Sequence, residues 1–300
     1  MTPPADANSR IVTEVLIDKM GITRINWETG TWERPHGEKP AAEIIIAGDW
    51  APIRDFSDRI LHSPKAIYGD LLPVLRDSQL RLVNLECPLV DDGISVHKSG
   101  ATLKGVSGHI KGLTTVPFDV ATLGNNHIFD YGTEAFVQTR ALLNQNGIQS
   151  TGAGHSLAEA ERPLIVAVKG IQIGIISFSE GEDLTAAGHE SPGVLGWEID
   201  RVMAKIKQIR SDVHVVIVIC HGGVEYIPFP PPYLADALKR IAEAGADLVI
   251  GHHPHVPRVF RSIKAFPSAT ALEILFFSSP PICCIEKLAT WLKPSWVRAV

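Results

Sequence analysis

The chain has 300 residues, of which 45% are hydrophobic and 20% are charged, the ordinary balance of a globular protein that can bury a large core. The formal net charge is −5 and the lysines and arginines are scattered, so the composition argues against a nucleic-acid-binding surface. The four cysteines form no Cys-x-x-Cys pair, which excludes a zinc ribbon and fits a reducing compartment.

The two ends of the sequence carry the weakest signals. Residues 1–40 are predicted to be partly irregular, with a short helix or strand at 11–20 and a loop at 30–40. Residues 1–10 are polar, and the apolar stretch 271–285 is interrupted at residues 278–281, so neither suits a signal peptide or a membrane span. We therefore expect a cytoplasmic location and no membrane span.

Predicted strands and helices alternate through most of the chain, which predicts an α/β fold whose strands are buried on both faces. In chain order, the expected elements are a strand at 43–48, a helix at 65–78 that Pro73 disturbs, a strand at 80–85, a short helix within 105–116, a strand at 118–123, a helix at 131–145, strands at 163–168 and 171–177, a loop at 181–196, a helix at 197–210, a strand at 213–220, a helix at 233–244 and a strand at 247–250.

Polar residues recur at one kind of place, directly after a predicted strand. They are Asp49 after the first strand, Asn84 and Glu86 after the second, Asn125, Asn126 and His127 after the third, His221 and Glu225 after the strand at 213–220, and His252, His253 and His255 after the last. In open α/β sheets, ligands bind at the carboxyl ends of the strands. We therefore expect these side chains to converge on one rim.

The chemistry of this set favours a metal site. Carboxylate, amide oxygen and imidazole form the mixed oxygen and nitrogen ligand set that suits Mn, Fe or Zn. We therefore expect one or two divalent ions as the cofactor. A pair of ions about 3.5–4 Å apart would suit an in-line displacement at phosphorus.

Each candidate has a structural alternative. Asp49 could be a turn residue or a helix cap, and Glu86 could be a solvated charge beside Pro88. Asn125 and Asn126 could be turn residues that tolerate positive φ, and His127 could be a histidine that caps the hydrophobic core. Among the clustered histidines, we expect His252 to be a structural neighbour of the ligands.

Six stretches, in order, resemble the bacterial capsule and poly-gamma-glutamate synthesis protein family (CapA-like), which is related to the calcineurin-like metallophosphoesterases. They are Gly48-Asp49, residues 84–89 (Asn-Leu-Glu-Cys-Pro-Leu), residues 98–100 (Lys-Ser-Gly), residues 125–132 (Asn-Asn-His-Ile-Phe-Asp-Tyr-Gly), residues 221–226 (His-Gly-Gly-Val-Glu-Tyr) and residues 244–256, which end in His-His-Pro-His-Val.

The resemblance implies a four-layer α/β/β/α sandwich of the metallo-dependent phosphatase type, and it implies a role for each matching residue. The implied metal ligands are Asp49, Glu86 as the bridging carboxylate, Asn126, His221, His253 and His255. His127 would be the general acid or a transition-state stabiliser, with Asn125 beside it in the catalytic group. Lys98 and Glu225 would contact an anionic substrate.

Three features depart from the pattern of the family or of its metallophosphoesterase relatives. Ala51 stands two residues after Asp49, where the metallophosphoesterase relatives have a histidine ligand, and the CapA-like pattern shares this difference. Gly222 replaces an aromatic residue. The closing Gly-Asn-Phe strand is not recognisable after Ala271. The expected organisation is an N-terminal extension at 1–40, a CapA-like metallophosphatase domain at 41–278 and an atypical C-terminal tail at 279–300.

The sequence thus predicts a metal-dependent, phosphoesterase-like hydrolase in which metal-activated water attacks a phosphoester or a related bond. The alternatives are a non-hydrolytic component of polyglutamate synthesis or export, and a degenerate binding module. The expected partners are a small anionic or polymeric substrate and other polymer-synthesis components, without nucleic acid.

Overall fold

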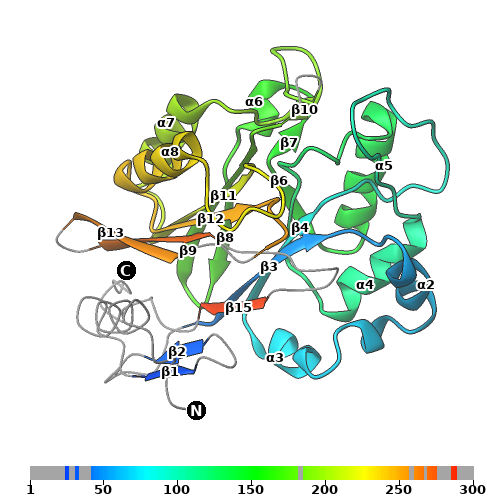
Figure 1. Ribbon diagram of the computed structural model, residues 1–300, viewed down its shortest axis with the longest axis horizontal. Helices are drawn as coiled ribbons and strands as arrows, with labels where there is room; N and C mark the ends of the chain where they lie inside the picture. The colour runs from blue at the N-terminus through cyan, green and yellow to red at the C-terminus, as the bar shows by residue number, and fades with distance from the viewer. Residues whose placement is uncertain are drawn as a thin grey trace.

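The computed structural model describes residues 42–181 and 185–256 in full, and in addition the backbone of five strands, two before and three after this region (Figure 1). The two early strands, β1 (Arg24–Asn26) and β2 (Thr31–Glu33), pair with each other in antiparallel orientation. The short element predicted at residues 11–20 lies outside the described residues.

The first large sheet has five strands in the order β15-β3-β4-β5-β6. Its parallel strands are β3 (Ile44–Trp50), β4 (Leu80–Leu85), β5 (Val120–Thr122) and β6 (Gln149–Thr151), and β15 (Ile285–Leu288) adds to the edge in antiparallel orientation. Crossover connections link its parallel strands, as the alternation of strand and helix in the sequence requires.

The second sheet has six strands in the order β13-β14-β12-β11-β9-β8. The three inner neighbours β9, β11 and β12 are parallel, and β14 is parallel to β12, whereas β8 and β13 are antiparallel to their neighbours. The bounds are β8 (Leu164–Val168), β9 (Ile171–Ser179), β11 (Val215–His221), β12 (Leu248–His252), β13 (Phe260–Phe266) and β14 (Ala269–Leu275). A separate pair joins β7 (Ala153–Gly154) to β10 (Gly193–Val194).

Three hydrophobic clusters show how the sheets and helices are layered. Alternate residues of β3 face opposite ways: Ile45 joins a cluster with the helices of the first sheet, whereas Ile44 and Ile46 join a cluster with residues of the second sheet. A third cluster joins β9, β11 and β12 to their own helices. The order is therefore helix, sheet, sheet, helix, and the predicted four-layer α/β sandwich is confirmed.

The helices cover the outer faces of the two sheets (Figure 1). Against the first sheet lie α2 (Asp55–His62), η1 (Pro64–Ile67), α3 (Leu71–Asp77), η2 (Ser107–His109), α4 (Ile110–Thr115) and α5 (Gly132–Gln145). Against the second lie α6 (Leu157–Ala160), α7 (Ile199–Ile209) and α8 (Pro232–Glu243). Among the described residues, no helix combines the length and the apolar character needed to cross a membrane.

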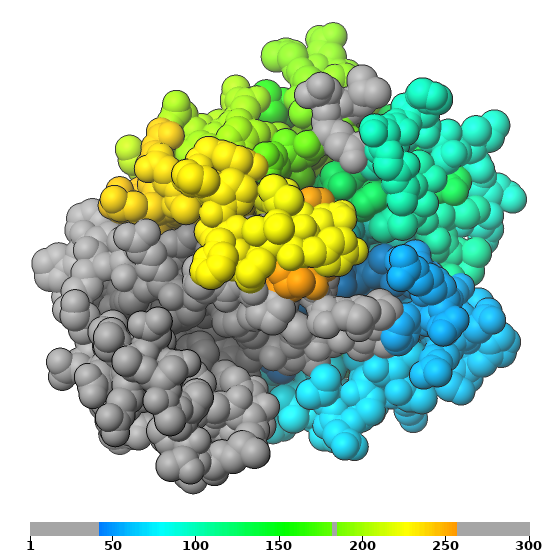
Figure 2. Space-filling model, viewed as in Figure 1, coloured from blue at the N-terminus to red at the C-terminus, as the bar shows by residue number. Residues whose placement is uncertain are grey.

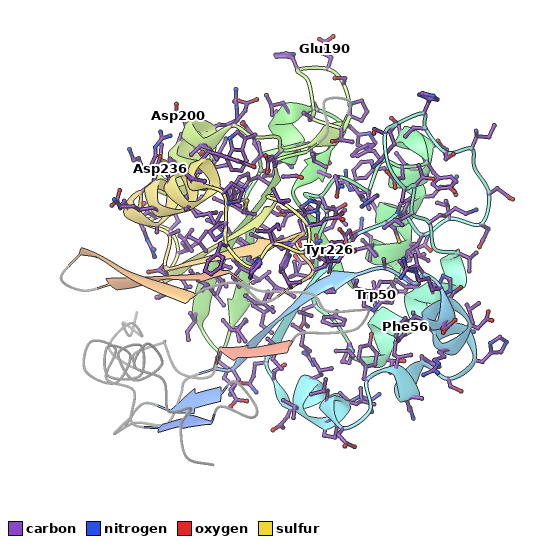
Figure 3. All side chains as sticks on the ribbon, in the orientation of Figure 1. Trp50, Phe56, Glu190, Asp200, Tyr226 and Asp236 are labelled. Atoms are coloured by element: carbon purple, nitrogen blue, oxygen red, sulfur yellow. The ribbon has the colours of Figure 1, made fainter. Side chains whose placement is uncertain are left out.

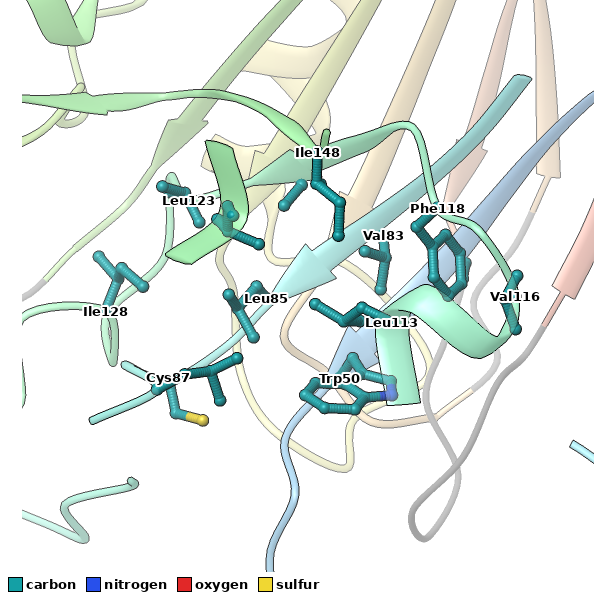
Figure 4. Packing of buried hydrophobic residues seen from close by; sticks show 14 of the residues in the cluster. Trp50, Val83, Leu85, Cys87, Leu113, Val116, Phe118, Leu123, Ile128 and Ile148 are labelled. Atoms are coloured by element: carbon teal, nitrogen blue, oxygen red, sulfur yellow. The ribbon is translucent and has the colours of Figure 1, made fainter. Parts of the chain in front are cut away.

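The packing under the first sheet is drawn in Figure 4, where Leu113 and Trp50 meet side chains of β4. Cys87 lies in the same cluster and is fully buried, as is Cys220 in the second sheet, so both behave as the reduced core residues that the sequence predicts. Burial, and to a lesser degree the charge of Glu86, raises the pKa of the Cys87 thiol, which makes it a poor nucleophile.

Two elements differ from the sequence prediction. The expected helix at 65–78 is split into η1 and α3, and the break falls at Gly69, whose φ is 49°, whereas Pro73 sits in the first turn of α3, where a proline is tolerated. The expected loop at 181–196 contains the short strand β10, which pairs with β7. Propensity alone does not reveal a two-residue strand, because tertiary pairing creates it.

Candidate metal centre

The carboxyl ends of strands from both sheets meet at one place. Asp49 pairs in register with Asn84 on the neighbouring strand, and His221 pairs with His252. The ladder of β3 shifts register between Ile46 and Asp49, and such an irregularity re-aims the side chains that follow it. This brings Asp49 to His221 of the other sheet, with Oδ1 at 3.5 Å from Nδ1.

Asp49 is the best-connected carboxylate of the site. Its Oδ1 accepts a hydrogen bond from Asn84 Nδ2 at 2.7 Å, and its Oδ2 accepts one from the backbone N–H of His253 at 2.9 Å. Burial alone would raise its pKa, but the charge of His221 and the hydrogen bonds from His221 and His255 hold the pKa of Asp49 well below its usual value. Asp49 is therefore a buried anion that ties the two sheets together.

Glu86 is a buried carboxylate in a different situation. It is 3% exposed, and its Oε1 has no hydrogen-bond partner within the described part of the chain, although His221 Nε2 lies 3.3 Å away. Burial, followed by the charge of Asp49, raises the pKa of Glu86. An uncompensated buried carboxylate is costly, so this oxygen fits a position that a cation would satisfy.

The imidazoles of the second sheet divide into two electrostatic classes. Burial lowers the pKa of His221, but the negative charges of Asp49 and Glu86, at 3.5 Å and 3.3 Å from its ring nitrogens, outweigh burial and raise the pKa to about 9. Burial lowers the pKa of His253 to about 3 and that of His252 to about 4, so both are neutral at pH 7. The Nδ1 atoms of His252 and His253 have no hydrogen-bond partner among the described residues.

Three groups of side chains bring their donor atoms within 4.8 Å of one another. They are Glu86, His221 and His253; Asp49, Glu86 and His255; and Glu225, His253 and His255. Carboxylate and imidazole are suitable ligands for Zn, Mn or Fe, and the unpartnered Glu86 Oε1 and His253 Nδ1 belong to these groups. On donor chemistry and burial, the residues fit a divalent metal.

Asn126 and Asn125 behave differently although they are adjacent. Asn126 Oδ1 lies 3.0 Å from His221 Nε2, at the edge of the metal-ligand groups. Asn125 is fully buried: its Nδ2 donates to Asn84 Oδ1 and to the Leu85 carbonyl, and its Oδ1 accepts from two backbone N–H groups of the following turn. This geometry favours a positioning role for Asn125 over the catalytic role predicted for it.

His127 is held by a residue to which the sequence analysis assigned no role. Its Nδ1–H donates to Asp130 Oδ2 at 2.6 Å, and Asp130 is fully buried. Lys98 Nζ donates to Asp130 Oδ1 at 2.8 Å and to the Asn126 carbonyl at 3.0 Å. The Lys98 side chain is 5% exposed, so the geometry favours an ion pair that orients His127 over the predicted contact with substrate.

A hollow of about 390 Å³ opens beside the metal-ligand groups. Its lining includes Asn126, Ser179, Glu180, His221, Glu225 and His253. Glu180 follows β9 and accepts hydrogen bonds from the Gly223 backbone N–H at 2.7 Å and from Tyr233 Oη at 2.5 Å. A side chain at Gly222 would put its Cβ 2.8 Å from Glu180 Cβ, which explains why this position is glycine here.

The loop between β11 and α8 carries Glu225 at the rim of this hollow. In Figure 2 the yellow segment that includes this loop stands at the surface, next to the orange segment that follows β12. Figure 3 places Tyr226 near the middle of the molecule, between the helices of the second sheet and Trp50 of the first. The structure therefore brings Asp49, Glu86, Asn126, His221, His253 and His255 to one place, with His127 close enough to His253 to interact with it electrostatically and Glu225 at the edge.

The family profile of the bacterial capsule synthesis protein PGA_cap matches residues 43–267, which is most of the chain and contains every residue of the site. The chain belongs to the PGA_cap family. The predicted resemblance to CapA-like proteins is thereby confirmed.

Curated relatives of this PGA_cap member carry names from polymer synthesis. The capsule biosynthesis protein CapA of Bacillus anthracis is 27% identical over 238 residues, covering 76% of this chain and 58% of that protein. The PGA biosynthesis protein CapA of Bacillus subtilis (strain 168) is 31% identical over 150 residues, covering 49% of this chain and 39% of that protein. The chain thus spans less than two thirds of the length of these relatives.

Among solved structures, the NAD nucleotidase of Haemophilus influenzae has a TM-score of 0.48 at 14% identity and covers 82% of this chain and 49% of that chain. The 5'-nucleotidase precursor from Thermus thermophilus has a TM-score of 0.48 at 12% identity and covers 85% of this chain and 55% of that chain. At such scores the fold assignment rests on the strand order and on the family profile, not on these neighbours.

Proposed function

We propose that this PGA_cap chain is a metal-dependent hydrolase that cleaves a phosphoester or a related bond. The proposal rests on the donor groups of Asp49, Glu86, His221, His253 and His255, which lie within 4.8 Å of one another in overlapping sets. Two buried atoms of these sets lack a hydrogen-bond partner among the described residues. A folded protein retains such costly atoms where a bound ligand compensates them.

The residues that would hold the metal are these five together with Asn126, and the metal would be Mn, Fe or Zn in one or two copies. When bound, a divalent metal would polarise a phosphoryl oxygen and lower the pKa of water to near neutrality. Asp49 would also keep its tie to the backbone of His253, and so hold the histidine turn against the first sheet.

His127 would handle the proton of the leaving group. Its Nδ1–H is committed to Asp130, so Nε2 is the ring atom left to meet a substrate. To donate a proton, Nε2 must carry one as well, so the acting form would be the imidazolium; Asp130 orients this ring, and Lys98 fixes Asp130 in turn. A general acid held in this way contributes about 10²–10⁴-fold to the rate.

The substrate we propose is an anion from polymer synthesis, because curated relatives are named for capsule and PGA biosynthesis. The hollow beside the metal groups is lined in part by the loop at 221–225, next to the donor groups that would hold the metal. The substrate would enter from the side of Glu225, which is exposed.

The test is hydrolysis of a generic aryl phosphate by wild type and by His127→Ala. We expect the variant to keep its metal and to lose activity by about 10²–10⁴-fold, since proton transfer is removed and the ligands are not. His62→Ala is the matched control, because His62 is an exposed helix residue whose ring contacts the Asp58 carbonyl of its own helix. Equal activity of His127→Ala and wild type would remove His127 from the mechanism.

A second candidate is a non-hydrolytic component of polyglutamate synthesis or export, and the names of the curated relatives favour it. In that case the site would bind an anionic polymer without turning it over. Saturable binding of polyglutamate by a protein that contains metal but hydrolyses no phosphoester would support this candidate. A protein with neither metal nor polyglutamate binding would instead be a degenerate member of the family.

A further inference from the structure

The outermost of the three donor groups differs from the other two because one of its members is exposed to solvent. Glu225, His253 and His255 lie within 4.8 Å of one another, and Glu225 is exposed while the two histidines are partly exposed. The group of Glu86, His221 and His253 is deeper, since Glu86 is 3% and His221 is 1% exposed. The two groups thus form an outer and an inner position for a cation.

The two positions share a side chain that cannot serve both. A neutral imidazole has one nitrogen with a free lone pair, so His253 can bind one ion at a time. His255 likewise belongs both to the outer group and to the third group, which contains Asp49 and Glu86, so His255 too can bind one ion at a time. When the buried positions are filled, His253 and His255 are both engaged, and Glu225 remains as the single donor of the outer group.

The backbone holds the outer group in place. The N–H of Tyr226, next to Glu225, donates to the carbonyl of Pro254 at 2.7 Å, between the two histidines. His253, His255 and Tyr226 have φ values of 92°, 55° and 59°, although none is glycine. Non-glycine residues in such conformations cluster at ligand-binding sites, because the surrounding contacts must maintain them.

We propose that Glu225, His253 and His255 form a transit site, where a divalent cation is first captured at the surface before it moves inward to Glu86 and His221. This inference rests on the metal centre of the proposed function. His253 stays bound during the move, while Glu225 and His255 are exchanged for Glu86 and His221. Glu225 is then a loading residue and not a ligand of the resting centre.

The proposal predicts a kinetic effect without an equilibrium effect. A residue that binds the ion in transit to a buried position speeds capture and release equally, so its loss changes both rates and leaves their ratio unchanged. Removing the carboxylate should slow loading by about tenfold, since a negative charge at the mouth of a site raises the rate of capture of a cation by at least that factor.

The experiment uses Co²⁺ alone as the probe, added to metal-free full-length chain and followed by its visible absorption in a stopped-flow instrument. We expect Glu225→Gln and Glu225→Ala to load about tenfold more slowly than wild type and to release Co²⁺ to a chelator about tenfold more slowly. Their Co²⁺ stoichiometry and dissociation constant should match those of wild type within about twofold, because the resting ligands are intact.

Glu190→Gln is the matched control, because Glu190 is an exposed glutamate far from Tyr226 at the top of the view in Figure 3. It removes the same charge and should load at the wild-type rate. Glu225 variants that load at the wild-type rate would overturn the proposal, and so would variants that lose stoichiometry, since Glu225 would then be a resting ligand. Wild type that binds no Co²⁺ would overturn the metal centre itself, and with it the transit site.

Discussion

The two sheets contribute unlike halves to the site. The first sheet supplies Asp49, Asn84 and Glu86. Asp49 and Asn84 are joined by hydrogen bonds, whereas Glu86 Oε1 has no hydrogen-bond partner within the described residues. The second sheet supplies imidazoles, and two of them, His252 and His253, keep Nδ1 without a hydrogen-bond partner there. Asp49 in the first half is therefore held by hydrogen bonds, whereas His253 in the second half keeps an unpartnered donor atom.

Because of this difference, substitutions at the two kinds of residue should affect different properties, namely the stability of the metal-free fold and the affinity for metal. Where a polar side chain is hydrogen-bonded in the metal-free protein, its removal should weaken the fold. Where a side chain has an unpartnered buried atom, its removal should weaken metal binding and leave the metal-free fold nearly unchanged.

The largest effect is expected for Asp49→Ala. Asp49 accepts from Asn84 and from the His253 backbone, and it faces a His221 that holds a proton in the metal-free protein. Breaking a buried ion pair by removing one partner lowers the free energy of unfolding by about 3–5 kcal/mol. Urea unfolding of the metal-free variant measures this loss, and a loss below about 1 kcal/mol would show that Asp49 does not hold the sheets together.

The opposite half is tested by His253→Ala. This variant should bind metal at least about a hundredfold more weakly, since a ligand is lost outright. Its metal-free form should unfold within about 0.5 kcal/mol of wild type, because the backbone N–H that bonds Asp49 is kept and the removed Nδ1 had no partner. Unchanged metal affinity, or a large loss of metal-free stability, would contradict the division into two halves.

A smaller effect concerns pH, where His221 and His253 should differ. The pKa of His221 is raised from 6.5 to about 9, so metal must displace a proton from it across this window, and affinity should rise with pH by about tenfold per unit. The same raised pKa stabilises the metal-free protein fully below pH 6.5. This stabilisation is lost as the pH rises towards 9.

His253 should show no such dependence. Its pKa is lowered to about 3, so no proton competes with metal at this ring above about pH 4. The measurement is a series of metal titrations between pH 6 and 9 on wild type and on His221→Ala. An affinity that falls with rising pH, or a slope that is as steep in His221→Ala as in wild type, would contradict the assignment.

The sequence predicted the inner donor residues because they obey a simple rule, that polar side chains after buried strands converge at one edge. Asp49, Glu86, His221 and His253 were found in this way and lie together in the structure. Glu180 obeys the same rule and was missed. The strand at 171–177 was predicted two residues shorter than β9, which ends at Ser179, so Glu180 did not directly follow a predicted strand.

Other contacts could not be predicted from the sequence, because they depend on the conformations of turns and loops and on which side chains these bring together. Asp130 reaches His127 through the turn between β5 and α5, and Lys98 reaches Asp130 from a loop 32 residues away in the sequence. A lone lysine and a lone asparagine give no sign of whether they face a substrate or a neighbour. In the structure, Lys98 and Asn125 face neighbours.

The fold was predictable to the extent that hydrophobic periodicity determines it. Runs such as Ile44–Ile46 and Val215–Ile219 are buried on both faces and were assigned as strands. The point at which a predicted helix is interrupted was less predictable, because both a glycine with positive φ and a proline can mark a turn. Here Gly69, with φ of 49°, divides the helical segment, and Pro73 does not.

The most direct test of the metal centre is elemental analysis of the purified protein, combined with an aryl phosphate assay before and after chelation. We predict Mn, Fe or Zn at one or two ions per chain, and hydrolysis that is lost with the metal and restored when the metal is returned. Metal-free protein whose hydrolytic activity a chelator leaves unchanged would contradict the account.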